Sequence, residues 1–298
     1  MSLAQQLTIK LAASFLSCAA ITAGAQMPRR LMETFMSNDG EARAQALSGL
    51  EHDRAGRYAE AIAAYNRALQ LAPNDAGLYN NLGNALANIG RFDEAITMLQ
   101  RAIKLSPDFA LAHFNLGVVY AQTNRPAQAI SALKEAIALN SQLVKARVGL
   151  CELHLTLEQN TEAVGCYEEL LSVDPSDAKA HINFGIALVR LKRYKEAIGG
   201  LQKTTRRFPT RAEAFNVLGS ALIETRCFKE AVVALARTLE LDPNHEAARF
   251  NLALAQLALK KRAAALEQYE FLKSSNKILA QRLYETIYGA RLLTADRK

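Results

Sequence analysis

The sequence has no tryptophan, and its 298 residues include only seven prolines and four cysteines. No Gly/Ser/Pro-rich linker or low-complexity tract divides the repeats described below. No glycine-rich phosphate loop, nucleophile elbow or Cys-x-x-Cys pair occurs, and no paired carboxylates recur on one face. We therefore expect no catalytic residues, no metal site and no cofactor, and the sequence shows no evident small-molecule substrate.

A short apolar run near the N-terminus spans residues 11–21, after Lys10. It is too short to cross a membrane as a helix. The small residues Ala23-Gly24-Ala25 follow it, so the pattern predicts a secretory signal peptide over residues 1–25 and an exported mature chain in the periplasm, the cell envelope or the extracellular space. Two alternatives stay open: a lipoprotein signal acylated at Cys18, and a buried N-terminal helix.

The dominant feature is a 34-residue period without insertions from residue 42 to 279. Position 20 of every repeat is alanine: Ala61, Ala95, Ala129, Ala163, Ala197, Ala231 and Ala265. Position 8 is small throughout: Gly49, Gly83, Gly117, Cys151, Gly185, Gly219 and Ala253. Position 32 is proline in five repeats: Pro73, Pro107, Pro175, Pro209 and Pro243. Small residues at positions 8 and 20 allow two antiparallel helices to approach closely.

Each period contains two segments in which apolar residues recur at helical spacing and form a stripe. In residues 79–107, Leu82 and Leu86 lie on one stripe, and Ile96 and Leu99 lie on another. Gly90 separates them, and a proline ends the second because proline cannot continue a helix. Such a helix–turn–helix hairpin cannot bury both stripes alone, so neighbouring repeats must stack.

This period and its Leu-Gly, Ala and Pro pattern resemble the tetratricopeptide repeat (TPR) family. The resemblance implies an all-α, right-handed superhelical solenoid with terminal capping helices. The predicted repeats are 42–75, 76–109, 110–143, 144–177, 178–211, 212–245 and 246–279.

The segments on either side of the repeats are expected to cover the ends of the array. Residues 26–41 form a joining or capping segment, although a self-ligand in the protein's own groove is an alternative. Residues 280–298 continue an apolar stripe through Leu283 and Ile287 and are expected to form a capping helix.

The formal net charge of +7 is concentrated at the C-terminal end. Residues 260–298 contain nine Lys or Arg and four Asp or Glu. A basic stripe along all repeats would favour nucleic acid, but this distribution does not. We expect no nucleic-acid partner and, at most, a weak contact of the basic end with an anionic surface.

Cysteine and histidine offer few sites. Cys151 and Cys166 lie in the two predicted helices of the fourth repeat, where packed thiols are expected rather than a disulfide, because the register is unfavourable. Cys227 has no evident partner. A metal cluster of Cys151, His154 and Cys166 lacks supporting ligand spacing, so these residues are expected to pack in the core.

The resemblance implies that the first helix of each repeat lines a concave groove. Asparagines recur there, and an amide offers a donor and an acceptor to a peptide backbone. This resembles the asparagine ladder of the family's peptide binders, although Asn is also common at this position in the family. The resemblance to the carboxylate clamp of the chaperone-tail binders is weak. The predicted ligand-binding residues are Asn80, Asn81, Asn84, Phe114, Asn115, Val118, Lys145, Ile182, Asn183, Asn216, Phe250 and Asn251.

These features predict a non-catalytic scaffold that binds a partner protein or an extended peptide in its groove. The alternative is a substrate-recruiting subunit or adaptor of an envelope enzyme complex.

Overall fold

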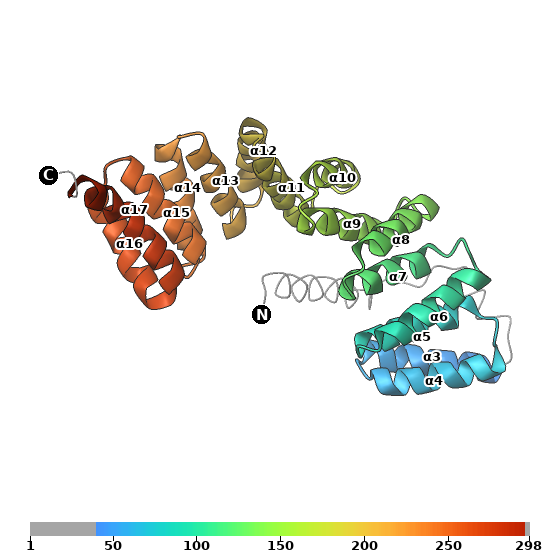
Figure 1. Ribbon diagram of the computed structural model, residues 1–298. Coiled ribbons are helices and arrows are strands. Elements are labelled where there is room, and N and C mark those ends of the chain that lie inside the picture. The colour runs from blue at the N-terminus through green and yellow to red at the C-terminus, as the bar shows by residue number, and fades with distance from the viewer. Residues whose placement is uncertain (1–39, 296–298) are drawn as a thin grey trace. The chain divides into compact units, whose positions relative to one another are not determined.

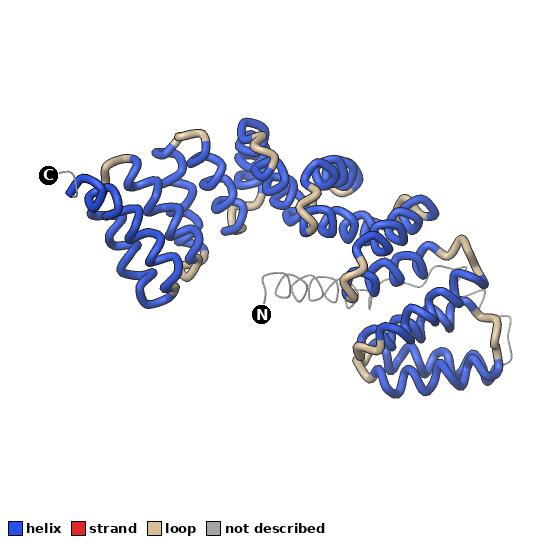
Figure 2. Tube along the Cα trace, in the orientation of Figure 1, coloured by secondary structure: helices blue, strands red, loops and turns tan. Residues whose placement is uncertain are grey.

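The computed structural model describes residues 40–295, and every element in that range is an α-helix (Figures 1 and 2). The predicted signal peptide and residues 26–39 of the joining segment lie outside the described residues. Contacts divide the chain into two units: the first ends at Leu157 and the second begins at Glu158. The prediction of an all-α array of helical hairpins is confirmed, whereas the handedness of the superhelix stays a prediction.

The helices alternate as the repeat predicts. In the first unit they are α3 (Gly40–Arg54), α4 (Tyr58–Leu71), α5 (Ala76–Asn88), α6 (Phe92–Leu105), α7 (Ala110–Gln122), α8 (Pro126–Leu139) and α9 (Val144–Thr156). In the second unit they are α10 (Asn160–Val173), α11 (Ala178–Arg190), α12 (Tyr194–Arg207), α13 (Ala212–Glu224), α14 (Phe228–Leu241), α15 (Glu246–Ala258), α16 (Arg262–Ser275) and α17 (Lys277–Ala295).

Every hairpin turns through a residue with a positive φ at position 15 of the repeat. Gly56 and Gly90 occupy it with φ of 72° and 79°. The other repeats place a side chain in the same left-handed conformation, at Asn124, Glu158, Lys192, Arg226 and Lys260. Because this conformation is unfavourable for most L-residues, packing of the two helices must stabilise the turn.

The close approach of the helices depends on the small residue at position 8. A Cβ atom added to Gly83 would lie 2.7 Å from Cγ of Leu99, and one added to Gly117 would lie 2.8 Å from Cγ of Leu133. Leu99 and Leu133 are fully buried. The glycine therefore leaves the space that the leucine at position 24 fills, as the sequence predicted.

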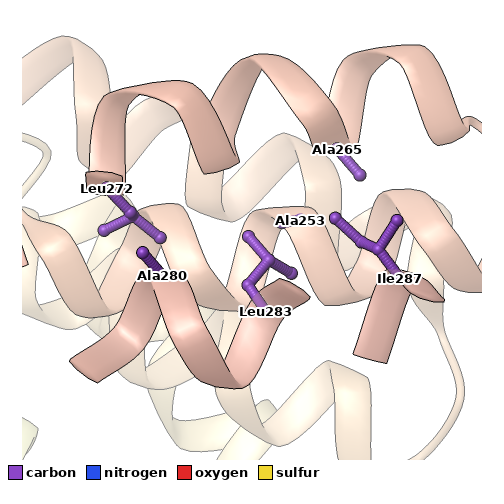
Figure 3. Close-up of a cluster of buried hydrophobic side chains, with 6 residues drawn as sticks. All are labelled: Ala253, Ala265, Leu272, Ala280, Leu283 and Ile287. Atoms are coloured by element: carbon purple, nitrogen blue, oxygen red, sulfur yellow. The ribbon is translucent and has the colours of Figure 1, made fainter. Parts of the chain in front are cut away.

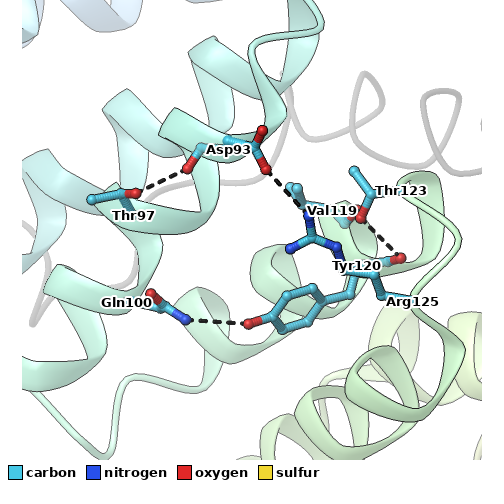
Figure 4. A network of polar contacts seen from close by, with 7 residues as sticks. All are labelled: Asp93, Thr97, Gln100, Val119, Tyr120, Thr123 and Arg125. Carbon is cyan, nitrogen blue, oxygen red and sulfur yellow. Dashed lines mark hydrogen bonds and ion pairs between the residues drawn. The ribbon is translucent and has the colours of Figure 1, made fainter.

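Polar side chains join successive hairpins in the first unit (Figure 4). Nη2 of Arg125 donates to Oδ1 of Asp93 at 3.2 Å, and Nε2 of Gln100 donates to the hydroxyl of Tyr120 at 3.2 Å. The Arg125–Asp93 pair is exposed, so it contributes little to stability. Burial of apolar side chains is the dominant favourable term.

The last helix caps the array. Leu283 and Ile287 of α17 pack with Leu272, Ala265 and other buried residues of α15 and α16 (Figure 3). This helix begins at Lys277 rather than at Ala280. None of the helices between residues 40 and 295 combines the length and apolar character that crossing a bilayer requires.

The cysteine prediction needs a correction. Cys151 and Cys166 are disulfide-bonded, so the prediction of two packed thiols is wrong. Position 8 lies against the second helix of the hairpin in other repeats, as Gly83 does against Leu99. Cys227 is an exposed free thiol. Within residues 40–295, no three side chains of His, Cys, Asp or Glu are arranged to hold a metal ion.

Candidate functional site on the first helices

The predicted ligand-binding residues all lie on the first helices of their repeats, and we call this surface the first-helix face. In the first unit they belong to α5, α7 and α9, and in the second to α11, α13 and α15.

Three amides of the first unit form a connected chain. Nδ2 of Asn115 on α7 donates to Oδ1 of Asn80 on α5 at 2.8 Å. Nδ2 of Asn80 in turn donates to Oδ1 of Asn81 at 3.2 Å. Nδ2 of Asn81 is buried and has no hydrogen-bond partner. The chain of amides therefore ends in an unused donor. Asn84 and Val118 on the same two helices are half-buried.

Some of the predicted ligand-binding side chains are buried. Asn183 is only 9% exposed, and its Nδ2 donates to the hydroxyl of Tyr167 at 3.0 Å. Asn80, Phe114 and Ile182 are also buried. A buried amide is stabilised by such an internal hydrogen bond, because a buried polar group without a partner is costly.

In the second unit the remaining residues are half-buried. Nδ2 of Asn251 donates to Oγ of Ser220 at 3.0 Å, and Oδ1 of Asn216 is buried without a partner. The guanidinium of Arg282 on α17 lies 5.1 Å from the centre of the Phe250 ring, so the capping helix already contacts this side chain. In the first unit, Lys145 on α9 is half-exposed.

Sequence analysis missed further polar atoms on the same face. Oδ1 of Asp53 on α3, Oε1 of Gln122 on α7 and Oε1 of Gln256 on α15 are all buried without a hydrogen-bond partner. Asp53 and Gln122 occupy positions 12 and 13 of their repeats, on the first helices that the family resemblance assigns to the groove. A polar residue at these positions was the available signal. Native proteins leave few such groups unpaired, so they need an explanation.

Asp53 has a strongly raised pKa. Burial raises its pKa from an ordinary 3.8 to about 6. The folded state therefore holds the proton more tightly than the unfolded state, and stability falls as pH rises from about 4 to 6. The full cost of the charged carboxylate is present above pH 6.

We expect Asp53→Asn to be more stable than the wild type by about 1–2 kcal/mol at pH 7.5, after allowance for solvent screening, and by little at pH 4. Urea unfolding of both proteins at the two pH values measures this difference. Glu51→Gln is the control, because Glu51 is an exposed carboxylate on the same helix. An equal gain at both pH values would contradict the assignment.

The comparisons with known proteins identify the repeat. A family model described as a tetratricopeptide repeat matches residues 80–143, 150–212, 184–245 and 216–272. A second model, described as a TPR repeat, matches residues 54–90. The comparison with curated protein sequences gives no match.

Solved structures share the architecture. YrrB, described as a TPR protein with an unusual peptide-binding site, is 23% identical with a TM-score of 0.53, over 63% of this chain and 97% of that one. A MamA structure is 27% identical with a TM-score of 0.51, over 54% and 94%. PilF of Pseudomonas aeruginosa is 17% identical with a TM-score of 0.57, over 71% and 97%. The likeness to YrrB and PilF shows the fold alone.

Proposed function

The chain belongs to the tetratricopeptide repeat family, and on this premise we propose that it is a non-catalytic scaffold that binds an extended peptide segment of a partner protein. The observation that carries the proposal is the set of unpaired polar atoms on the first helices. An extended backbone offers N–H and C=O groups at regular intervals along its length. Such groups would pair the donor of Asn81 and the acceptors of Asn216 and Gln122, once these half-buried side chains rotate toward the peptide.

The proposal assigns the peptide site of the first unit to Asn81, Asn84, Asn115 and Val118. The amides supply donors and acceptors, and Val118 supplies half-buried apolar surface. Asn80 and Phe114 support these side chains from the interior and do not contact the peptide. In the second unit, Asn216 and Asn251 have the corresponding roles.

We also propose that the protein acts outside the cytoplasm. The predicted signal peptide supports export, and the disulfide-bonded state of Cys151 and Cys166 is typical of oxidising compartments. On this proposal the mature chain begins at Gln26.

We expect Asn81→Ala combined with Asn84→Ala to weaken peptide binding by about 1–3 kcal/mol, since each lost hydrogen bond costs about 0.5–1.5 kcal/mol. The probe is a twelve-residue peptide selected against the full chain from a random library, and calorimetric titration measures its affinity. The control variant, Thr97→Ala combined with Gln128→Ala, changes exposed side chains on the second helices α6 and α8.

Asn115 is left unchanged so that Oδ1 of Asn80 keeps its donor. Asn81→Ala does remove the acceptor of Nδ2 of Asn80, so a small loss of stability is expected in this variant. Melting temperatures of both double variants separate a folding defect from a binding defect. The proposed site is wrong if both bind the peptide with wild-type affinity, or if only the second-helix variant loses binding.

A further inference from the structure

A cavity of about 320 Å³ lies in the second unit among α10, α11 and α12, and it has no role in the proposed function. Its walls are mainly apolar: they include Leu171, Phe184, Leu188, Leu201 and Phe208. Most of the lining comes from α11 and α12, and none of the predicted ligand-binding residues belongs to it, so the cavity is distinct from the proposed peptide site. Its volume is at the lower end of the range for small-molecule sites in proteins.

A glycine leaves space at the wall of the cavity. Gly200 lines it from α12, and a Cβ atom added there would meet nothing within 4 Å. Gly200 occupies position 23 of its repeat, where the other repeats carry Ala64, Met98, Ala132, Cys166, Ala234 and Gln268. A glycine inside a helix costs about 0.5–1 kcal/mol relative to alanine. Gly200 therefore lowers both the packing and the helix propensity of α12 at this position.

Cations lie around the apolar walls. Lys203 and Arg207 of α12 both line the cavity and are exposed, and within residues 40–295 neither has a recorded ion pair. Nη1 of Arg207 donates to the carbonyl oxygen of Pro175 at 2.7 Å, which fixes the guanidinium and leaves other N–H donors unused.

His181 and Asp174 complete the polar surroundings. Nε2 of His181 lies 2.9 Å from the same carbonyl of Pro175. The carboxylate of Asp174 accepts hydrogen bonds from Oγ and the backbone N–H of Ser176 at 2.6 and 3.0 Å. Ser176 therefore satisfies one oxygen of Asp174, and the carboxylate also interacts electrostatically with Arg207. Lys203 and Arg207 together carry one more charge than Asp174.

We propose that this cavity binds a small apolar carboxylate, with the hydrocarbon body against the leucine and phenylalanine walls and the carboxylate at Lys203 and Arg207. The apolar walls favour a hydrocarbon, and the excess of positive charge selects an anionic head group over a neutral one. Decanoate is a simple probe of this chemical class. This inference does not depend on the peptide site.

The test is calorimetric titration of decanoate into the full chain. We expect saturable binding, at least about tenfold weaker binding to Gly200→Leu, and wild-type binding to Gly199→Leu. Gly199 is the matched control because it is adjacent, exposed and also without atoms near its Cβ position, but does not line the cavity. Both substitutions improve helix propensity, so neither is expected to unfold α12.

A second arm tests the head group. Lys203→Ala combined with Arg207→Ala should weaken decanoate binding several-fold and leave binding of 1-decanol unchanged. The proposal is overturned if the wild type does not bind decanoate, if Gly200→Leu binds it as well as Gly199→Leu does, or if the alcohol and the carboxylate bind equally. Melting temperatures of all variants confirm that each is folded.

Discussion

Leu133→Ala is expected to lower the free energy of unfolding by about 2–5 kcal/mol. Leu133 is fully buried and lies against Gly117, at the point where α7 and α8 approach closely. Alanine would remove that packing and leave a cavity between the helices. Urea unfolding measures the change. Val233→Ala is the control, because Val233 is 71% exposed on a second helix and its truncation should have little effect.

A double-mutant cycle tests the same contact from its other side. Gly117→Ala alone should destabilise the protein by about 1–3 kcal/mol, because its Cβ would overlap Leu133. In the Leu133→Ala background the same methyl group would enter the vacated space, so its cost should disappear or change sign. Strictly additive effects would show that the two residues do not share this contact.

Deletion of residues 280–298 is expected to destabilise the second unit by at least about 3 kcal/mol and to cause self-association. The deletion removes Leu283 and Ile287 and uncovers Leu272 and Ala265 (Figure 3). Chemical unfolding and size-exclusion chromatography measure the two effects. A truncated chain that stays monomeric and equally stable would show that α17 is not a cap.

A pair of point variants separates the cap from the simple loss of chain. Leu283→Asp places a charge at a fully buried position, whereas Ile278→Asp makes a similar substitution at a position that is 75% exposed on the same helix. Only the first should reproduce the effect of the deletion, since a buried unpaired charge is strongly unfavourable.

The sequence was sufficient to predict the hairpins because their determinants are local. The small residue at position 8 and the larger one at position 24 recur every 34 residues, and they pack against each other, as Gly83 does with Leu99. The capping helix was predictable for a similar reason, because Leu283 and Ile287 continue an apolar stripe.

The details of the candidate site could not be predicted in the same way. Whether an asparagine faces solvent depends on its neighbours: Asn183 bonds to a tyrosine hydroxyl, whereas Asn115 bonds to another asparagine. The cavity beside Gly200 was also missed, because the loss of one side chain leaves the periodic pattern intact. The pattern indicates which positions are small, but the space left around a glycine depends on the side chains of three helices.

The turn residue at position 15 limits which insertions and deletions the chain can tolerate. Each hairpin carries its own left-handed residue, whether this is Gly90 or Arg226, and its own small residue at position 8. A duplication or deletion in the gene that spans one whole period keeps both features in phase. A change of any other length would put a helical residue at the turn and a large side chain at the helix crossing. The surface formed by the first helices can therefore be lengthened or shortened during evolution by whole repeats, but not by part of a repeat.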